Sequence, residues 1–148
     1  MYSDDSDMKI LRELAKDSRL SFRALGKKLG LATTTVIHRY DKMKKDGIIK
    51  YPSLMIDHEK LGYDIVAMIE ILVSKGRLVE VEEKISKKQN VYAVYDITGD
   101  TDTVILARFK DRKELNDFVK SLLAMEFVER TNTHLVLNVV KEDPNATI

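Results

Sequence analysis

The chain lacks features that would assign it to several other classes of protein. None of its 148 residues is cysteine, which excludes disulfides and thiolate metal sites. Its longest apolar run lies within Ile65–Val73 and includes Glu70, whereas a membrane-spanning helix needs about 20 residues. The acidic N-terminus, MYSDDSDMK, does not have the basic-then-apolar pattern of a signal peptide. We therefore expect a soluble, cytoplasmic protein with no membrane partner.

Signatures of catalysis and metal binding are also missing. The sequence contains no phosphate-binding loop, no G-x-G-x-x-G and no nucleophile motif. His38, His58 and His134 fall on different expected elements, without the spacing of metal ligands. Asp100 and Asp102 are a close pair of carboxylates, but aspartates also form turns by bonding to nearby backbone. The sequence therefore predicts a protein that is not an enzyme and uses no cofactor or metal.

The net charge of +1 conceals an asymmetry between the two parts of the chain. Residues 1–52 contain 12 Lys and Arg against 7 Asp and Glu, a balance of +5. Residues 53–148 contain 13 against 17, a balance of −4, so the two parts sum to +1. A basic part joined to an acidic part suggests that the first part binds a polyanion.

Residues 21–47 have the pattern of two helices joined by a tight turn. Ser21 is a favourable N-cap for the first helix, and Gly30 ends it by adopting the left-handed conformation. Gly26 is unfavourable inside a helix, which indicates close approach of a neighbouring helix. The second helix is expected from about Thr33 to Asp46. Its buried positions are Val36, Tyr40 and Met43. The pattern is that of a helix-turn-helix.

The outward face of the second helix carries side chains suited to DNA. Recognition helices contact base edges with residues of their first turns. Arginine pairs with guanine, threonine contacts bases, and lysines bind phosphates. The DNA-contacting residues predicted on this basis are Ser21, Lys27, Lys28, Thr33, Thr34, Thr35, His38, Arg39 and Lys42. Basic residues on helix surfaces are also commonly solvated, so this pattern by itself does not establish DNA binding.

A helix over residues 4–16, capped by Ser3 or Asp5, is expected to complete a three-helix domain. Its apolar stripe consists of Ile10, Leu11, Leu14 and Ala15. Ile48–Tyr51 reads as a short strand whose pairing is limited by Pro52. These patterns place the first domain at 1–51 and a linker at 52–63.

Residues 64–148 show strand and helix patterns in the order β-α-β-β-α-β, so the fold class is α+β with a ferredoxin-like second domain. The predicted elements are Ile65–Val73, Arg77–Lys88, Val91–Thr98, Thr103–Phe109, Asp111–Leu123 and Val128–Val140. A tight hairpin turn is expected at 99–102 and a loose tail at 141–148.

The strand Ile65–Val73 is mainly apolar on both of its faces. Two helices cover one face of a ferredoxin-like sheet, and an uncovered apolar face would be a large exposed patch of the kind that marks an interface. We therefore predict dimerisation sheet to sheet. The alternative is that the first domain covers this face.

Four stretches of the chain together resemble the Lrp/AsnC family of prokaryotic transcription regulators, also called feast/famine regulatory proteins. Asp7–Leu11 resembles the opening helix of the family, and Leu25–Leu31 followed by Val36–Ile49 resembles its helix-turn-helix and the strand after it. Asp57–Tyr63 resembles its linker. Gly99–Asp102 and Thr131–Thr133 resemble the effector-domain turn and the T-x-T of the last strand.

This resemblance implies a sequence-specific regulator that binds promoter DNA through the second helix of the motif. It also implies homodimers formed through the sheet, often assembled into octamers, with an amino acid sensed at contacts between dimers. The effector-binding residues that it implies are Gly99, Asp100, Thr101, Asp102, Thr131 and Thr133.

The chain departs from the family pattern at Ala32, at Thr101 and at His58, which stands where the linker often has proline. Ala32 stands where the family often has serine as a helix cap, so Thr33 is expected to cap the recognition helix instead. Thr101 replaces the aromatic residue of G-D-Y-D, which weakens the case for amino-acid binding. Two alternatives remain. One is a decarboxylase acting on sirohaem, a class that resembles the family in both domains, and the other is a sensor that does not bind DNA. The basic first domain and the threonine-lined helix favour the regulator.

Overall fold

The computed structural model describes residues 4–146, which form two units. The first consists of residues 4–55 together with 141–146, and the second consists of residues 56–140. The tail therefore groups with the helical unit rather than with the sheet. Over the described residues, no helix combines the length and the apolar character needed to span a bilayer.

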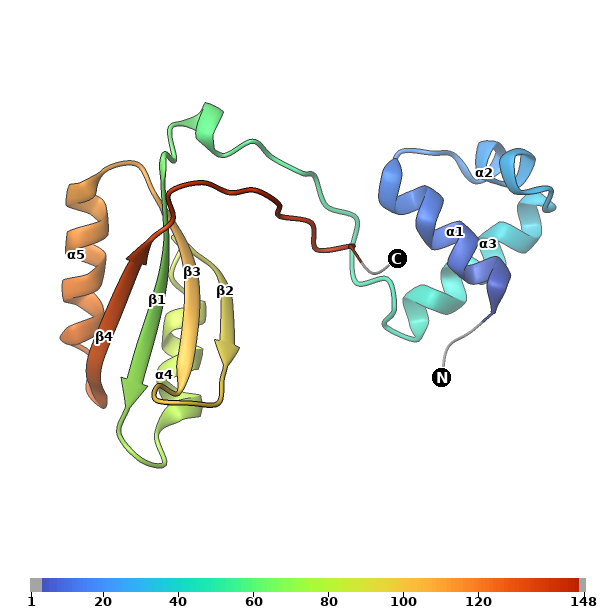
Figure 1. The fold of residues 1–148 in the computed structure, drawn as a ribbon. Coiled ribbons are helices and arrows are strands. Elements are labelled where there is room, and N and C mark those ends of the chain that lie inside the picture. The colour runs from blue at the N-terminus through green and yellow to red at the C-terminus, as the bar shows by residue number, and fades with distance from the viewer. Residues whose placement is uncertain (1–3, 147–148) are drawn as a thin grey trace. The chain divides into compact units, whose positions relative to one another are not determined.

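The first unit contains three helices, α1 (Asp5–Lys16), α2 (Phe22–Leu29) and α3 (Thr33–Lys45) (Figure 1). Side chains from all three meet in a small core. Its fully buried members are Ile10, Leu25, Val36 and Met43. The rings of Phe22 and Tyr40, with centroids 5.0 Å apart, extend the packing between α2 and α3. The predicted three-helix domain is confirmed, although Ala15 of its expected stripe is exposed.

The helix ends confirm some of the expected caps and correct others. Asp4 caps α1 by accepting from the Ser6 N–H at 2.9 Å. The expected cap Asp5 is instead the first helical residue, and Ser3 lies outside the described residues. Ser21 Oγ accepts from the Ala24 N–H at 3.2 Å, and Gly30 ends α2 at a φ of 68°, both as predicted.

The turn between α2 and α3 differs from the prediction in two respects. Ala32 occupies the N-cap position of α3 and provides no capping bond, while Thr33 is already helical, so the prediction that Thr33 caps this helix is wrong. A Cβ on Gly26 would lie 2.7 Å from the Leu31 carbonyl oxygen. The closest approach is therefore made by the backbone of the turn, and the start of the neighbouring helix α3 comes next, with the Thr33 nitrogen at 3.5 Å.

The strand predicted at Ile48–Tyr51 is not formed. The N–H groups of Ile48 and Ile49 donate to the Met43 carbonyl at 2.9 and 3.2 Å, after Gly47 has turned the chain at a φ of 74°. This segment therefore completes the end of α3 instead of joining a sheet. In the expected linker, a short 3-10 helix spans Glu59–Leu61.

The second unit is a four-stranded antiparallel sheet with two helices (Figure 1). In chain order its elements are β1 (Ile65–Val73), α4 (Leu78–Ser86), β2 (Val91–Asp96), β3 (Thr103–Phe109), α5 (Arg112–Leu123) and β4 (Val128–Leu135). The strands lie in the order β2-β3-β1-β4. This is the predicted ferredoxin-like arrangement, and it confirms the α+β class.

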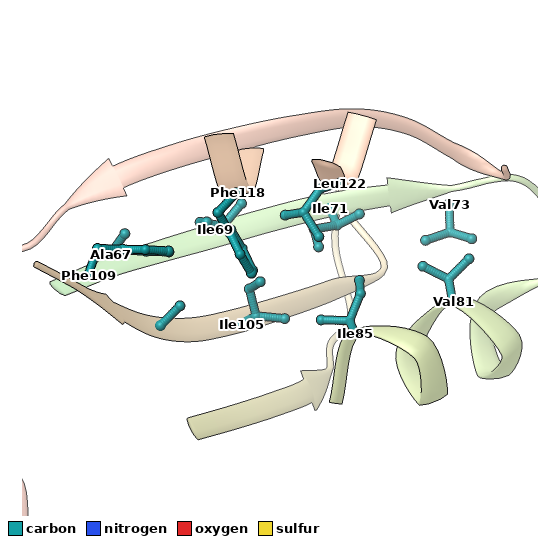
Figure 2. Close-up of a cluster of buried hydrophobic side chains, with 11 residues drawn as sticks. Ala67, Ile69, Ile71, Val73, Val81, Ile85, Ile105, Phe109, Phe118 and Leu122 are labelled. Carbon is teal, nitrogen blue, oxygen red and sulfur yellow. The ribbon is translucent and has the colours of Figure 1, made fainter. Parts of the chain in front are cut away.

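Alternation along β1 and β3 directs one set of side chains towards α4 and α5, where they form the core of the unit. Figure 2 shows these side chains between the sheet and the helices. The Phe109 and Phe118 rings pack edge to face with centroids 5.0 Å apart. The buried members are Ala67, Ile69, Ile71, Val73, Val81, Ile85, Ile105, Ala107, Phe109, Phe118 and Leu122. Burial of this set on one face places both helices on the same side of the sheet.

The predicted bounds of β1 and β3 are confirmed, but β4 ends earlier than expected. The Val136 N–H still donates to the Val66 carbonyl at 2.9 Å, close to the start of β1. Beyond that point β4 has passed the end of its neighbour, and Leu137 is 99% exposed. The β2–β3 connection is also longer than the predicted tight turn. β2 ends at Asp96, and the connection is closed by a hydrogen bond from the Ile97 N–H to the Asp102 carbonyl.

Candidate nucleic-acid interface and effector turn

The outer face of α3 presents polar side chains to solvent. Val36 and Met43 anchor the opposite side of the helix in the core. The exposed set on this face consists of Thr33, Thr34, Thr35 and His38. Within residues 4–146, these four side chains have no hydrogen bond or ion pair that would hold them inside the unit. These four residues, which we call the reading face, occupy the first turns of the helix, where base contacts are expected.

Arg39, predicted as a base-reading residue, is engaged inside the helical unit. Its Nη1 donates to Asp4 Oδ2 at 2.5 Å and to Asp7 Oδ1 at 3.0 Å, both on the N-terminal part of α1. The hydrogen bond to Asp4, with that to Asp7, raises the pKa of Arg39, and the same arginine lowers the pKa of Asp4. The structure therefore gives Arg39 a partner other than a base.

Asp7, the buried partner of Arg39, was not expected from the sequence. It is 2% exposed and lies three positions before Ile10, on the apolar side of α1. A carboxylate on a buried helix stripe requires a partner, because an unpaired buried charge is strongly unfavourable. That position on the stripe was the available signal.

Ser21 and Lys28, also predicted to contact DNA, have partners within the unit. Ser21 Oγ is occupied as the cap of α2. Lys28 forms an ion pair with Glu13 of α1, and its hydrogen bond lowers the pKa of that carboxyl. Lys27 and Lys42 lie exposed on α2 and α3.

In the expected effector turn, Asp102 is committed to the backbone of β1. Its carboxylate accepts from the Val73 N–H at 2.8 Å, and its own N–H donates to the Ile71 carbonyl at 3.1 Å. The Asp102 side chain therefore joins the turn to the β-bulge at Leu72 and Val73, while its carbonyl closes the turn by accepting from the Ile97 N–H. Asp100 and Gly99 are exposed, and Thr101 is half-buried.

The two threonines of the last strand lie beside this turn to different degrees. Thr131 pairs with Ile71, which pairs in turn with Thr103 at the end of the turn. Thr133 pairs with Ile69, two positions further into the sheet. Both share the helix-covered face with their partners. The structure thus brings residues 99–102 and Thr131 to one end of the sheet and leaves Thr133 further away.

The other face of the sheet, which we call the open face, is apolar along β1 and β3 and polar along β4. Its apolar members on these two strands are Val66, Met68, Leu72, Val104 and Leu106, beside the charged Glu70 and Arg108. Glu70 accepts from Asn132 Nδ2 at 2.9 Å and lies 3.2 Å from His134 Nε2. These contacts, with Asn132 first, lower the pKa of Glu70. The face is therefore more polar than the alternation of β1 alone indicated.

A three-helix unit whose third helix, here α3, presents an exposed polar face is typical of helix-turn-helix DNA-binding proteins. Residues 3–50 match the family described as winged helix-turn-helix DNA-binding. Residues 66–146 match the family described as Lrp/AsnC ligand binding domain.

Similar proteins extend over nearly the whole chain. An uncharacterised HTH-type transcriptional regulator of Pyrococcus furiosus is 43% identical over 97% of both chains. The HTH-type transcriptional regulator FL11 of the same organism is 40% identical over 94% of this chain and 92% of its own. Among solved structures, LrpC of Bacillus subtilis has a TM-score of 0.86 at 28% identity, covering 95% of this chain and 99% of its own. AsnC of Escherichia coli has a TM-score of 0.89 at 24% identity, covering 96% and 97%.

The chain belongs to the Lrp/AsnC family, and it is a transcriptional regulator with a helix-turn-helix and an Lrp/AsnC ligand-binding domain. The names of its relatives are those of regulators, which favours this function over the decarboxylase-like alternative.

Proposed function

We propose that the protein binds operator DNA sequence-specifically as a homodimer, through the reading face of α3, and that a small effector modulates this binding. The observation that carries the proposal is that Thr33, Thr34, Thr35 and His38 are all exposed while the back of the same helix is fully buried. A helix anchored in this way can enter a major groove without disturbing the core of its unit.

The chemistry of the exposed side chains suits two kinds of contact. Threonine hydroxyls and methyls, and the His38 ring, contact base edges in the major groove. Lys27 and Lys42 bind phosphates, which contribute affinity without sequence preference. In a dimer, two such helices occupy successive major grooves about 34 Å apart.

We assign dimerisation to the open face of the sheet. Val66, Met68, Leu72, Val104 and Leu106 form an apolar surface on the side that α4 and α5 do not cover. An interface with an apolar centre and polar groups towards one side is the usual composition of a protein–protein contact. Assembly beyond the dimer, up to the octamers common in the family, would use other surfaces.

The effector site is proposed at the end of the sheet bounded by residues 99–102 and Thr131. A regulator of Neisseria meningitidis solved in complex with L-Met shares the fold, with a TM-score of 0.88 at 24% identity over 97% of this chain and 95% of its own. In this chain Asp100 is exposed. Its carboxylate suits the amino group of an amino acid, whereas the Asp102 carboxylate is already bonded to Val73.

The first test is gel-shift binding to duplex DNA from the region upstream of the protein's own gene. Selective binding should resist unrelated competitor DNA and weaken steeply as salt is raised. Lys27→Ala should weaken all sequences alike and reduce the salt slope by about 1. Lys87→Ala removes another exposed lysine, in the sheet unit, and is the matched control that should leave binding unchanged. Absence of selective binding to this duplex, and to any duplex enriched from a randomised pool, would contradict the proposal.

The effector arm uses the same assay with a panel of free amino acids. We expect at least one amino acid to change the affinity for DNA, and Asp100→Asn to remove that response while binding in its absence stays the same. A response that survives Asp100→Asn would place the effector elsewhere.

A further inference from the structure

Arg39 lies on the recognition helix, yet its charged group points to α1. We infer that Arg39 is a positioning residue that fixes α3 against α1 and does not contact bases. This inference rests on the proposed binding of DNA through α3. It removes from the reading face the side chain whose chemistry would otherwise make it the first candidate for pairing with guanine.

The contacts of the guanidinium are the first support. A single nitrogen, Nη1, bonds two carboxylates that lie three residues apart on α1, at 2.5 Å and 3.0 Å. Asp7 is 2% exposed, so it cannot exchange Arg39 for water without leaving a buried charge unpaired. Withdrawing Arg39 to reach a base would therefore be opposed by the burial of Asp7.

The position of Arg39 on the helix is the second support. It follows Val36 by three residues and precedes Met43 by four, a spacing that puts it beside the buried side of α3. Its side chain is 28% exposed, whereas the neighbouring His38 belongs to the exposed set. Arg39 thus lies between the core and the reading face, partly exposed, with its charged group bonded to α1.

Few other contacts fix the orientation of α3, and the ring contact of Tyr40 is made with Phe22 of α2 rather than with α1. Its fully buried side chains are Val36 and Met43, and its first turn has no capping side chain. Apolar contacts are non-directional, whereas hydrogen bonds between a guanidinium and carboxylates demand a defined geometry. Arg39 therefore supplies the directional contact that holds the reading face at one angle relative to α1.

The pairing of Arg39 with Asp4 and Asp7 also affects the charge that the helical unit presents to DNA. Asp4 and Asp7 are carboxylates beside a helix that must approach phosphates. Arg39 compensates this negative charge within the unit, which reduces repulsion without any direct contact to the nucleic acid.

The test compares Arg39→Met, which keeps the aliphatic stem, with Asp7→Ala and with the double variant in the full-length protein. The probe is a duplex that the wild-type protein enriches from a randomised pool, together with all single-base-pair changes of that duplex. Binding is measured at a temperature at which circular dichroism shows every variant to be folded. If Asp7→Ala does not fold, Asp7→Asn takes its place.

We expect each single variant to lose affinity for DNA several-fold, by the same factor for every duplex. The double variant should lose no more affinity than the single variant that binds DNA more weakly. Arg39→Lys, which keeps the charge, should recover part of the loss. Asp7 cannot contact DNA itself, so a shared, non-additive loss is the signature of a positioning pair.

Two results would overturn the inference. In the first, Asp7→Ala leaves affinity unchanged while Arg39→Met loses discrimination at one base pair, by the roughly 5- to 150-fold expected of a lost base contact. In the second, the variants lower the unfolding temperature but bind as tightly as wild type when folded, which would make the pair purely structural. A wild-type protein that enriches no duplex would instead contradict the proposed function itself, and this inference with it.

Discussion

The two units of the chain differ in the interactions that stabilise each of them internally. The sheet unit buries eleven side chains in one core, whereas the helical unit buries four. The helical unit has ion pairs within α1, as between Lys9 and Asp5, and also pairs that join one helix to another, as between Arg39 and Asp7 or between Lys28 and Glu13. In the sheet unit, the ion pairs on α4 and α5 stay within a single helix, as between Lys113 and Asp117.

This difference shows what a small DNA-binding unit requires. A large apolar core stabilises the sheet unit without help from surface charges, and pairs along one exposed helix contribute little to stability. Four buried side chains define the packing of three helices less completely. Directional contacts and tight turns therefore have a larger share in placing the recognition helix.

The largest effect is expected from removing an aromatic ring from the core of the sheet unit. Phe109→Ala should lower the free energy of unfolding of this unit by about 3–5 kcal/mol, because Phe109 is fully buried against Phe118. Urea unfolding measures the loss, and hydrogen exchange followed by mass spectrometry locates it. Leu123→Ala, at a half-exposed position of α5, is the control with a small effect. The expected loss is confined to the sheet unit, and equal loss of protection in residues 4–55 would contradict this prediction.

A smaller effect is expected at the turn of the helical unit. Gly26→Ala adds a Cβ within 2.7 Å of the Leu31 carbonyl oxygen, a backbone atom that cannot move alone. The resulting overpacking should destabilise this unit by about 1–3 kcal/mol, despite the better helix propensity of alanine. Chemical denaturation gives the value, and the exposed neighbour Lys27→Ala provides the control. A stabilised Gly26→Ala protein would show that the turn relaxes freely.

A gain of stability is expected at the uncapped start of α3. Ala32→Thr introduces a hydroxyl that can accept from a free N–H of the first turn, and should stabilise the helical unit by about 0.5–2 kcal/mol. Ala32→Val has nearly the same shape and no acceptor, so it should bring no comparable gain. The two melting curves are compared directly, and equal curves would mean that the new hydroxyl does not cap the helix.

The smallest effect is expected from acid, and it can be assigned to one unit. Hydrogen bonding with Arg39 lowers the pKa of Asp4 in the folded state below its ordinary value of 3.8, so the ionised carboxylate favours folding. That contribution is present at neutral pH and is lost as the pH falls below about 4, through the folded pKa. Asp4→Asn keeps a capping side chain but should flatten this acid dependence in residues 4–55.

The matching change in the sheet unit tests whether the acid effect is specific to one unit. Asp117 also has a pKa lowered from 3.8, by hydrogen bonding with Lys113. Asp117→Asn should therefore alter the acid dependence of the sheet unit and leave residues 4–55 as in wild type. Hydrogen exchange between about pH 5 and about pH 3 measures both units at once. A change in acid dependence in the sheet unit for Asp4→Asn, or in residues 4–55 for Asp117→Asn, would contradict the assignment of each effect to its own unit.

Local features of the sequence were enough to predict much of this fold. The bounds of β1 and β3 followed from their β-rich runs, apolar on both faces, and the ends of α2 from Ser21 and Gly30. Two strand predictions were wrong for one common reason. These are the strand expected at Ile48–Tyr51 and the last five residues expected in β4. A strand exists only where a neighbour pairs with it, and the position of that neighbour is set by distant parts of the chain.

The predicted site shows the same division. The exposure of Thr33, Thr34, Thr35 and His38 follows from helix periodicity, because a buried seam implies an outer face. The partners of Arg39, Lys28 and Asp102 were not foreseen, since each belongs to another element of the fold.

The sequence by itself determined the order of helices and strands, most of their ends, the resemblance to a family of regulators and the face of α3 that meets solvent. These properties depend on residues a few positions apart, whose geometry is set by helix and strand periodicity. Only the tertiary structure decided which charged side chains remain available. Pairing brings together groups as far apart in the chain as Asp7 and Arg39, and that proximity is created only when the helices pack.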